Sequence, residues 1–308
     1  MILRENAVKQ PKLGLSDERG ALDTNTFAFK CRDTEFDLSS RTHIMGVLNT
    51  TPDSFYDGGN YTHLDAALKQ AEKMMEEGAD IIDIGGESTR PGSLPVSVEK
   101  ELERVIPVVR GIRKRFDIPL SVDTTKSAVA RRALDEGASI VNDISGLRFD
   151  PDIADVAHDY GAGIVLTHTT SRPLDMQSNT EYGSLLGDIK LSLKNSVNIA
   201  ELKGVNPASI VIDPGFGFGK TVEQNLAILK YLKSFLELNK PILIGTSNKT
   251  FIGKVLDAPT GDRIEGTAAT IAIGILNGAS IIRVHETGYM KRVSQMIDAI
   301  LNVSCESY

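Results

Sequence analysis

The feature that most constrains this chain is a repeated alternation of short apolar runs with longer segments of helical periodicity. Eight runs rich in Ile and Val predict strands at residues 44–48, 81–84, 120–122, 140–141, 163–166, 210–212, 242–244 and 281–284. Eight segments of helical periodicity predict helices at residues 64–77, 98–115, 127–136, 153–160, 189–203, 222–235, 264–277 and 290–301. Because the runs are apolar almost throughout, we expect parallel strands that are buried on both faces.

Four of the predicted helices end at a Gly-Ala pair directly before the next strand. These pairs begin at Gly78, Gly137, Gly161 and Gly278. Glycine adopts the left-handed conformation of a helix C-cap at little cost, after which the chain can turn into a strand. The recurrence of one turn indicates a single repeating α/β architecture. Eight units favour a (β/α)₈ TIM barrel over a doubly wound open sheet, which usually has about six strands and a topological switch point.

The N-terminal segment differs from the repeating part. Residues 1–25 are largely polar and aperiodic, so we expect a loose extension. Apolar residues then alternate with small or polar ones on both sides of a polar break, at Phe27, Phe29, Cys31, Phe36 and Leu38. This pattern predicts a two-stranded β-hairpin ahead of the barrel. Residues 26–308 are therefore assigned to one domain.

Composition excludes several classes of protein. The chain has 308 residues, of which 41% are hydrophobic, and a formal net charge of −7, which argues against broad binding to nucleic acid or to an anionic membrane. Cys31 and Cys305 lie near opposite ends, so a disulfide framework is not expected. No apolar run reaches the length of a membrane helix, and the first residues lack the core of a signal peptide. We therefore expect a soluble, cytoplasmic protein.

In a TIM barrel the active site lies at the carboxyl ends of the strands. Polar or charged side chains follow all eight predicted strands, and the candidates are Asn49, the loop from Gly85 to Gly92, Asp123, Asn142, His168, Asp213, the loop from Ser247 to Thr250, and Arg283 with His285. Any one of them is equally well explained as a helix N-cap. Together they predict a polar mouth.

The predicted mouth contains two kinds of groups. Asp123, Asn142 and Asp213 offer hydrogen-bonding groups to a flat, nitrogen-rich heterocycle. Cations for a phosphate or a carboxylate come from a second set, Lys220, Lys249, Arg283 and His285. We therefore expect a small-molecule site that binds a heterocycle and an anion.

The glycine-rich loop at residues 213–220 (DPGFGFGK) matches neither a P-loop nor a dinucleotide fingerprint. Its glycines can permit a tight turn, or they can hold the backbone close to a planar ligand beside Phe216 and Phe218. His43 and His63 are interpreted as surface or loop residues, and His158 as part of a helix, without a functional role. No histidine pair indicates zinc. Mg²⁺ can bind through Asn49 and phosphate oxygens, because it often keeps several waters.

Six motifs, in the correct order from about Phe27 to the C-terminus, resemble those of the dihydropteroate synthase family. They are residues 45–59 (MGVLNTTPDSFYDGG), 85–92 (GGESTRPG), 121–124 (SVDT), 141–144 (VNDI), 213–220 (DPGFGFGK) and 283–285 (RVH). The resemblance implies a pterin-binding TIM barrel. It also implies the condensation of 6-hydroxymethyl-7,8-dihydropterin pyrophosphate with p-aminobenzoate, which releases pyrophosphate in folate biosynthesis.

The resemblance also implies roles for individual residues. The pterin would be held by Asp123, Asn142, Asp213 and Lys249. Pyrophosphate would be bound by Asn49, Arg283 and His285, with Mg²⁺ bound through Asn49. The p-aminobenzoate site would be shaped by Thr89, Arg90, Pro91, Phe218, Ser247 and Thr250. Loops at residues 50–60 and 86–95 would close over the substrates, and a homodimer is expected because family members are commonly dimers.

The chain departs from the family pattern at several positions, namely Thr50, Tyr56, Thr167, Thr169, Asn248 and Glu286. Asn248 stands where the family usually has Arg, so one cation is absent from this loop. The changes at Thr167, Thr169 and Asn248 are the support for an alternative, a weakened or non-catalytic paralogue that binds pterin. A second alternative is a related barrel that presents methyltetrahydrofolate to a corrinoid, but that protein would not need Arg283 and His285.

Overall fold

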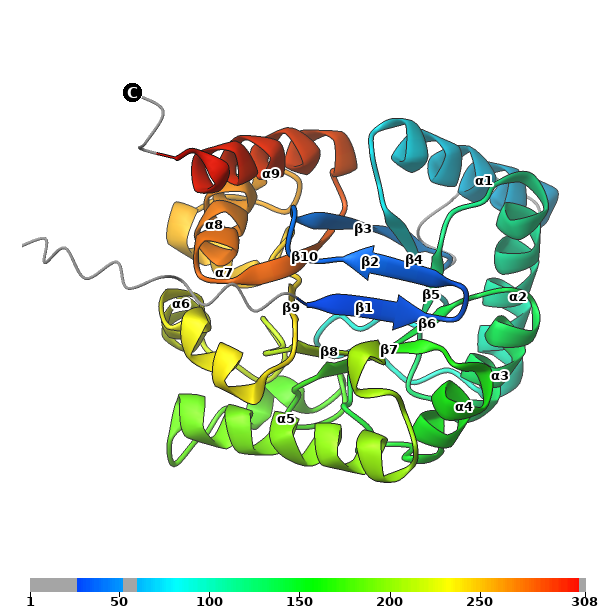
Figure 1. Ribbon diagram of the computed structural model, residues 1–308, viewed down its shortest axis with the longest axis horizontal. Helices are drawn as coiled ribbons and strands as arrows, with labels where there is room; N and C mark the ends of the chain where they lie inside the picture. The colour runs from blue at the N-terminus through cyan, green and yellow to red at the C-terminus, as the bar shows by residue number, and fades with distance from the viewer. Residues whose placement is uncertain (1–26, 52–59, 305–308) are drawn as a thin grey trace, which may run out of the picture.

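The computed structural model describes residues 27–51 and 60–304, and its central element is a closed barrel of eight parallel strands (Figure 1). In chain order the barrel strands are β3 (His43–Asn49), β4 (Ile81–Gly85), β5 (Leu120–Asp123), β6 (Ile140–Asp143), β7 (Gly163–Thr167), β8 (Ile210–Asp213), β9 (Ile242–Ile244) and β10 (Ala279–Val284). Strand β10 pairs with β3 and closes the ring. The predicted TIM barrel is confirmed.

Helices surround the barrel and connect its strands (Figure 1). The described residues form nine α-helices: α1 (Asn60–Glu76), α2 (Val98–Arg115), α3 (Ser127–Asp135), α4 (Asp152–Tyr160), α5 (Leu185–Leu202), α6 (Val222–Lys230), α7 (Thr250–Leu256), α8 (Ile264–Leu276) and α9 (Thr287–Asn302). Three short 3₁₀ helices are η2 (Met176–Ser178), η3 (Pro207–Ser209) and η4 (Leu232–Leu238). Eight of the nine α-helices occupy predicted helical segments.

Side chains alternate between the helix layer and the barrel interior along each strand. In β4, Ile82 and Ile84 belong to the core between strands and helices, whereas Ile81 belongs to a second cluster inside the barrel. The same period of two places Asp83 in the interior, one layer above Ile81. The interior is therefore apolar near the amino ends of the strands and polar near their carboxyl ends.

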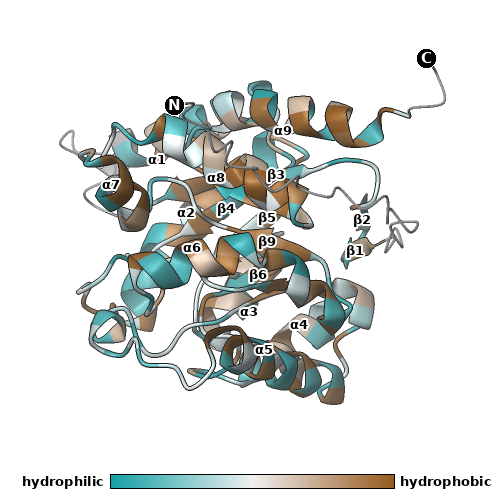
Figure 2. Ribbon diagram, turned by 90° about the vertical axis from the view of Figure 1, so that its left-hand side faces the viewer, coloured by the Kyte–Doolittle hydropathy of each residue, from teal (hydrophilic) through white to brown (hydrophobic). Residues whose placement is uncertain are grey.

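The predicted hairpin closes the amino-terminal end of the barrel. Strands β1 (Ala28–Cys31) and β2 (Thr34–Asp37) are antiparallel and lie across this end (Figures 1 and 2). Phe29 and Cys31 are fully buried and pack in one cluster with the lowest interior layer of the strands. Among the described residues, the polar layer of the barrel interior therefore lies at the opposite end, away from the hairpin.

The four Gly-Ala turns are confirmed by their backbone angles. Gly78, Gly137, Gly161 and Gly278 all have positive φ, at 93°, 102°, 58° and 99° respectively. In each case the glycine follows the last helical turn, and the strand begins within a few residues. This repeated turn brings the chain from the outer helices back to the barrel.

Three expectations from the sequence are corrected. His43 lies in β3 and is only 4% exposed, because its ring packs edge-on against Phe36 of the hairpin. The segment predicted as one helix over residues 222–235 is divided into α6 and η4, with Tyr231 at the junction. Helix α7 was not predicted. Within the described residues, no helix has the length and apolarity needed to cross a membrane.

Two further expectations lie outside the described residues. The proposed loose extension at residues 1–25 is one of them, and most of the 50–60 loop, including Tyr56, is the other.

Candidate active site

The carboxyl ends of the strands bring the predicted heterocycle-binding groups together. Asp123 is the last residue of β5, Asn142 lies in β6, and Asp213 is the last residue of β8. Their side chains are buried, with exposed fractions of 6%, 3% and 6% respectively. Asp123 and Asn142 are neighbours across the β5–β6 pair. Each lies in the interior because the residue before it faces the helix layer. The strand alternation alone therefore directs these polar groups to one mouth.

Arg283 of β10 is the central cation of this layer. Its Nη2 donates to Asp123 Oδ2 at 2.6 Å, and its Nε donates to Asp83 Oδ2 at 2.6 Å. Burial alone would lower the pKa of Arg283, but Asp83 and Asp123 raise it well above its usual value. Asn142 also donates to Asp83, over 3.0 Å. Asp83 was not among the predicted site residues.

Burial governs the ionisation of the other groups in this layer. It raises the pKa of Asp123 to about 7, although Arg283 opposes the shift, and it raises the pKa of Asp213 as well. It lowers the pKa of Lys249 to about 8, and Arg283 adds to this effect. The pKa of His285 falls to about 4, first through burial and then through nearby cations. The site therefore combines an imidazole that is neutral at pH 7 with carboxyl and ammonium groups whose burial disfavours their charged forms.

The glycine-rich loop after β8 folds over a buried lysine. Asp213 Oδ1 accepts from Gly215 N at 2.7 Å and fixes the start of the loop. Lys220 Nζ donates to Gly215 O and Phe218 O at 2.8 and 2.9 Å, and it lies 3.1 Å from His168 Nδ1. Burial lowers the pKa of Lys220 to about 7. The contacts place the Lys220 ammonium under its own loop, so its position is suited to shaping the loop.

The loop after β9 supplies a second set of predicted residues. The Lys249 ammonium lies over the Phe218 ring, 4.4 Å from its centre, and joins this loop to the glycine-rich one. Ser247 Oγ lies 3.0 Å from His285 Nδ1. Thr250 begins α7 and is exposed. The loop therefore brings Ser247 and Lys249 to the same side of the mouth as His285.

The family departure at Asn248 has a structural explanation. Asn248 has a φ of +57°, in the left-handed region that Asn adopts more readily than other non-glycine residues. Its carbonyl accepts from Arg263 Nη1 at 3.0 Å, and its amide donates to Thr267 Oγ1. The arginine that is usual in the family is thus replaced by Asn248, whose type is suited to the left-handed backbone of this turn.

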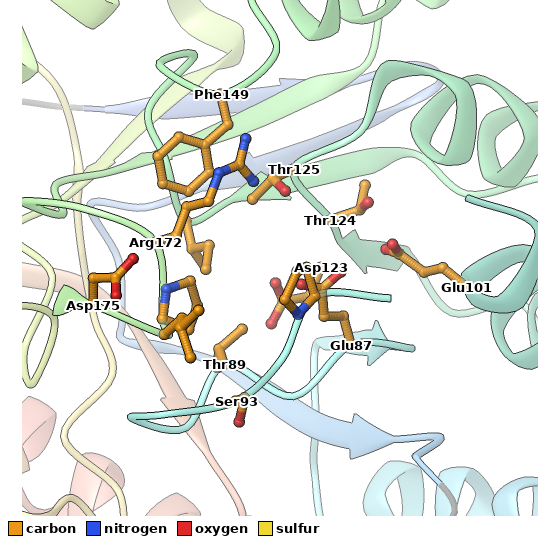
Figure 3. Close-up of a pocket in the computed structure, with 14 residues that line it drawn as sticks. Glu87, Thr89, Ser93, Glu101, Asp123, Thr124, Thr125, Phe149, Arg172 and Asp175 are labelled. Atoms are coloured by element: carbon orange, nitrogen blue, oxygen red, sulfur yellow. The ribbon is translucent and has the colours of Figure 1, made fainter. Parts of the chain in front are cut away.

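A pocket opens beside Asp123 between the loops that follow β4, β5, β6 and β7 (Figure 3). Its lining includes Glu87, Thr89, Asp123, Ile144, Phe149 and Arg172. The Arg172 guanidinium lies over the Phe149 ring, 4.4 Å from its centre (Figure 3). Thr89 faces this pocket, whereas Arg90 and Pro91 are exposed further along the loop.

The loop that carries Thr89, Arg90 and Pro91 is anchored at both ends. Near its start, Glu87 and the buried Glu101 of α2 both accept from Lys126 Nζ, and Arg104 donates to Gly86 O at 2.7 Å. Beyond Pro91, Gly92 N donates to Pro173 O at 2.9 Å. The loop is therefore held to the barrel at one end and to the loop after β7 at the other.

Asn49 ends β3 and lies at the rim, half-buried. Gly85 lies next to it in the β3–β4 pair, and a Cβ at Gly85 would approach Asn49 Oδ1 to 3.8 Å and Asp123 Oδ2 to 3.7 Å. Because Gly85 has no side chain, a space remains there that is bordered by Asn49 Oδ1 and Asp123 Oδ2. Residues 27–51 and 60–304 contain no group of three His, Cys, Asp or Glu side chains arranged for a metal ion.

Asp83 could have been found from the sequence, because it interrupts the apolar run Ile81-Ile82-Asp83-Ile84. A charged residue inside a strand that is buried on both faces needs a charged or hydrogen-bonding partner. The predicted candidates all follow the strands, whereas Asp83 lies within one. Phe149 and Arg172 gave no such signal, since they lie in loops of irregular composition.

Comparisons with known proteins agree with this geometry. The family model described as pterin binding enzyme matches residues 45–285. Dihydropteroate synthases of Synechocystis and Bacillus subtilis are 48% and 49% identical over 268 and 262 residues, which cover 87% and 85% of this chain and 93% and 90% of theirs.

Solved structures give the same result. A Yersinia pestis dihydropteroate synthase with a sulfonamide drug has a TM-score of 0.84 at 38% identity and covers 90% of this chain and 100% of its own. A Xanthomonas albilineans dihydropteroate synthase with 4-aminobenzoic acid has a TM-score of 0.85 at 36% identity, with coverage of 91% and 100%.

The barrel and the polar layer at its mouth define the class as a pterin-binding (β/α)₈-barrel enzyme. The relatives that share nearly half of its residues over almost their whole length are synthases rather than methyltransferases. The chain belongs to the dihydropteroate synthase family. It is a transferase of folate biosynthesis.

Proposed function

We propose that the buried side chains of Asp123, Asn142 and Asp213, together with the half-buried Lys249, form a layer that holds the pterin during synthesis of 7,8-dihydropteroate. The observation that carries this proposal is the placement of two carboxyl groups and one amide in one buried mouth at the carboxyl ends of the strands. A pterin presents several ring nitrogens and an amino group, which such groups can pair. Phe218 is buried and lies against Lys249 at one side of the layer.

The pyrophosphate of the pterin substrate is assigned to the adjacent part of the rim, formed by Asn49, Arg283 and His285. Arg283 and His285 lie two residues apart in and after β10, so both side chains face the interior. Burial lowers the pKa of His285 to about 4, and a neutral imidazole still has one N–H that can donate to a phosphate oxygen. Arg283 supplies the positive charge.

Mg²⁺ is proposed as the cofactor at this rim. Asn49 Oδ1 beside the space above Gly85 provides an oxygen ligand of the type that Mg²⁺ prefers, and phosphate oxygens and waters would complete its coordination. Bound there, the ion supplies positive charge to the pyrophosphate. The absence of an acidic cluster among the described residues is compatible with this arrangement, because Mg²⁺ often takes few protein ligands.

The second substrate, p-aminobenzoate, is assigned to the outer part of the mouth. Thr89, Arg90 and Pro91 border it on one side, and Phe218 with the Ser247–Thr250 loop borders it on the other. Arg90 is exposed and can attract a carboxylate from solution. The aryl amine is then directed toward the pterin methylene carbon.

The residues suit a reaction that depends on orientation and electrostatics. The aryl amine is a neutral nucleophile, so a strong general base is not needed. The C–O bond to pyrophosphate breaks as the amine nitrogen bonds to the methylene carbon, and the nitrogen then passes its proton to solvent water. Arg283 and His285 stabilise the leaving charge, while Asp123 stabilises positive charge on the pterin.

Two properties of the whole molecule are also proposed. Exposed apolar side chains gather on α8 and α9, at Ile273, Leu276, Tyr289, Met296 and Ile300. Such a surface supports a homodimer, which sedimentation equilibrium would test. A cytoplasmic location is proposed for the enzyme, and cell fractionation would test it.

The test of the proposed roles is a coupled assay for pyrophosphate release with pterin pyrophosphate, p-aminobenzoate and Mg²⁺. Release that requires all three components supports the assignments. Release that does not depend on p-aminobenzoate would contradict the transfer step, and release that persists in EDTA would contradict the Mg²⁺ proposal.

A further inference from the structure

Asp83 joins two of the proposed substrate ligands through one carboxylate oxygen. Its Oδ2 accepts from Arg283 Nε at 2.6 Å and from Asn142 Nδ2 at 3.0 Å. These partners come from β10 and β6, on either side of the barrel interior. A single carboxylate in β4 therefore links the residue assigned to pyrophosphate with a residue assigned to pterin.

Asp83 lies too deep to meet a substrate itself. It is 0% exposed, and it pairs with Ser121, whereas the next interior position, Gly85, pairs with Asp123. Asp83 therefore occupies the layer directly beneath Asp123. Any effect that it has on the reaction must be transmitted by the side chains that it holds.

The two carboxylates on Arg283 differ in their surroundings. Asp123 lines the pocket and is therefore accessible to a ligand, whereas Asp83 is sealed below it. A ligand that engages Asp123 can displace the Nη2 contact, but the Nε contact to Asp83 lies out of its reach. Asp83 thus fixes the Nε edge of the Arg283 guanidinium. The Nη2 edge can exchange its contact with Asp123 for a contact with a ligand.

A purely structural requirement would not favour a carboxylate at this position. The layer below is filled by Ile81, Ile140, Ile281 and other apolar residues, which pack at no electrostatic cost. Asp83 Oδ1 and the neighbouring Ser121 Oγ have no hydrogen-bond partner among the described residues. Some polar groups of this layer therefore lack hydrogen-bond partners. The carboxylate of Asp83 is better explained by its hydrogen bonds with Arg283 and Asn142 in the layer above.

We propose that Asp83 is a positioning residue of the synthase reaction, which orients Arg283 toward the pyrophosphate and Asn142 toward the pterin. This inference rests on the substrate assignments proposed above. Because the pair is buried and hydrogen-bonded, loss of the carboxylate leaves the guanidinium with Asp123 as its remaining hydrogen-bond partner among the described residues. Arg283 would then turn toward Asp123 and away from the leaving group.

The test compares Asp83→Asn with a matched control, Asp80→Asn. Asp80 precedes β4 by one residue and also pairs with an arginine, Arg41, over 2.6 and 2.9 Å, but it does so at the opposite end of the barrel. Both substitutions neutralise an arginine-paired carboxylate and preserve side-chain shape. They differ in whether the arginine belongs to the proposed active site.

We expect Asp83→Asn to lower kcat by about 100-fold, the effect expected for a misplacement of about 1 Å, while KM for p-aminobenzoate changes little. Asp80→Asn should retain the wild-type kcat and KM. In the Arg283→Ala background, adding Asp83→Asn should lower kcat by no more than about threefold, because residues that act as a unit are not additive. A structural defect would instead reduce activity by the same factor in both backgrounds.

Wild-type kcat in a folded Asp83→Asn protein would overturn the inference, as would a full 100-fold further loss in the Arg283→Ala background. Turnover by the wild type and by Asp80→Asn tests the proposed function separately from the role of Asp83. If Asp83→Asn does not fold, Asp83→Ser provides a smaller polar replacement. If neither variant folds while Asp80→Asn does, the carboxylate is required for the barrel itself, and the positioning role is rejected.

Discussion

The Lys249 ammonium lies 4.4 Å from the centre of the Phe218 ring, so that a cation of the β9 loop rests on an aromatic residue of the β8 loop. Gly217 permits this approach, because a Cβ there would meet Lys249 Cδ at 3.2 Å. Phe218 is 6% exposed, and Lys249 has a pKa lowered to about 8 by burial. The contact joins the proposed pterin and p-aminobenzoate sites.

Replacing Phe218 by Leu should remove this contact while leaving an apolar side chain. A cation–π contact in a desolvated site contributes about 2 kcal/mol, so we expect KM for p-aminobenzoate to rise by more than tenfold. Phe218→Tyr keeps the ring and should stay within about threefold of the wild-type KM. Steady-state kinetics would show this difference, and equal KM values for both variants would contradict the role assigned to the ring.

Lys249→Ala and Asp213→Asn should each remove pterin binding without unfolding the barrel. Hydrogen bonds to charged groups contribute about 1.5–3 kcal/mol, so affinity should fall by at least tenfold. The Asn replacement retains an oxygen that can accept from Gly215 N, and Lys249 is only half-buried, so both substitutions should be tolerated. Isothermal titration calorimetry with a pterin would measure the loss, and unchanged affinity in both variants would refute the site assignment.

Gly215→Ala should be far more destabilising than Gly161→Ala. Both glycines have positive φ, at 75° and 58°, so an alanine at either position costs about 1–2 kcal/mol in backbone strain. At Gly215 the new Cβ would lie 1.9 Å from His168 O, whereas at Gly161 it meets nothing within 4 Å. Overpacking adds about 1–3 kcal/mol at Gly215. Denaturant unfolding would measure both, and equal losses would show that the loop can shift.

Acid should destabilise the wild type relative to a His168→Asn variant. Burial lowers the pKa of His168 from 6.5 to about 2, and Lys220 adds to the shift. The unfolded chain therefore takes up a proton below pH 6.5 that the folded protein does not, and stability present above pH 6.5 is lost as the pH falls. Between pH 7.5 and 5.5 the wild type should lose about 1.4 kcal/mol relative to the variant. If the difference in free energy of unfolding between the wild type and His168→Asn did not change with pH, this prediction would be contradicted.

The barrel could be predicted from the sequence because its strands are buried on both faces. An apolar run such as Ile210-Val211-Ile212 leaves little ambiguity about its environment, and β8 extends it by one residue, Asp213. Helix α7 could not be predicted in this way. It has seven residues and contains Gly253, whose missing side chain makes room for Arg263, so it shows no amphipathic period.

The site was only partly predictable, because a sequence gives the identity of a polar residue but not the direction of its side chain. Asp123, Asn142 and Asp213 lie in the buried mouth, as expected for residues at the ends of barrel strands. Lys220 stays a predicted substrate contact, and the structure adds that its ammonium is directed to the carbonyls of Gly215 and Phe218. That direction depends on the turn of three left-handed glycines, which the sequence pattern does not specify.

We propose that the buried polar mouth joins a pterin to an aryl amine. Mass-spectrometric measurement of 7,8-dihydropteroate, made in parallel with pyrophosphate, tests this claim most directly. We predict that the two products form in a one-to-one ratio with the wild-type protein, and that both form at least tenfold more slowly with Asp213→Asn at subsaturating pterin pyrophosphate. Pyrophosphate without dihydropteroate, or equal product from the wild type and Asp213→Asn, would contradict the account.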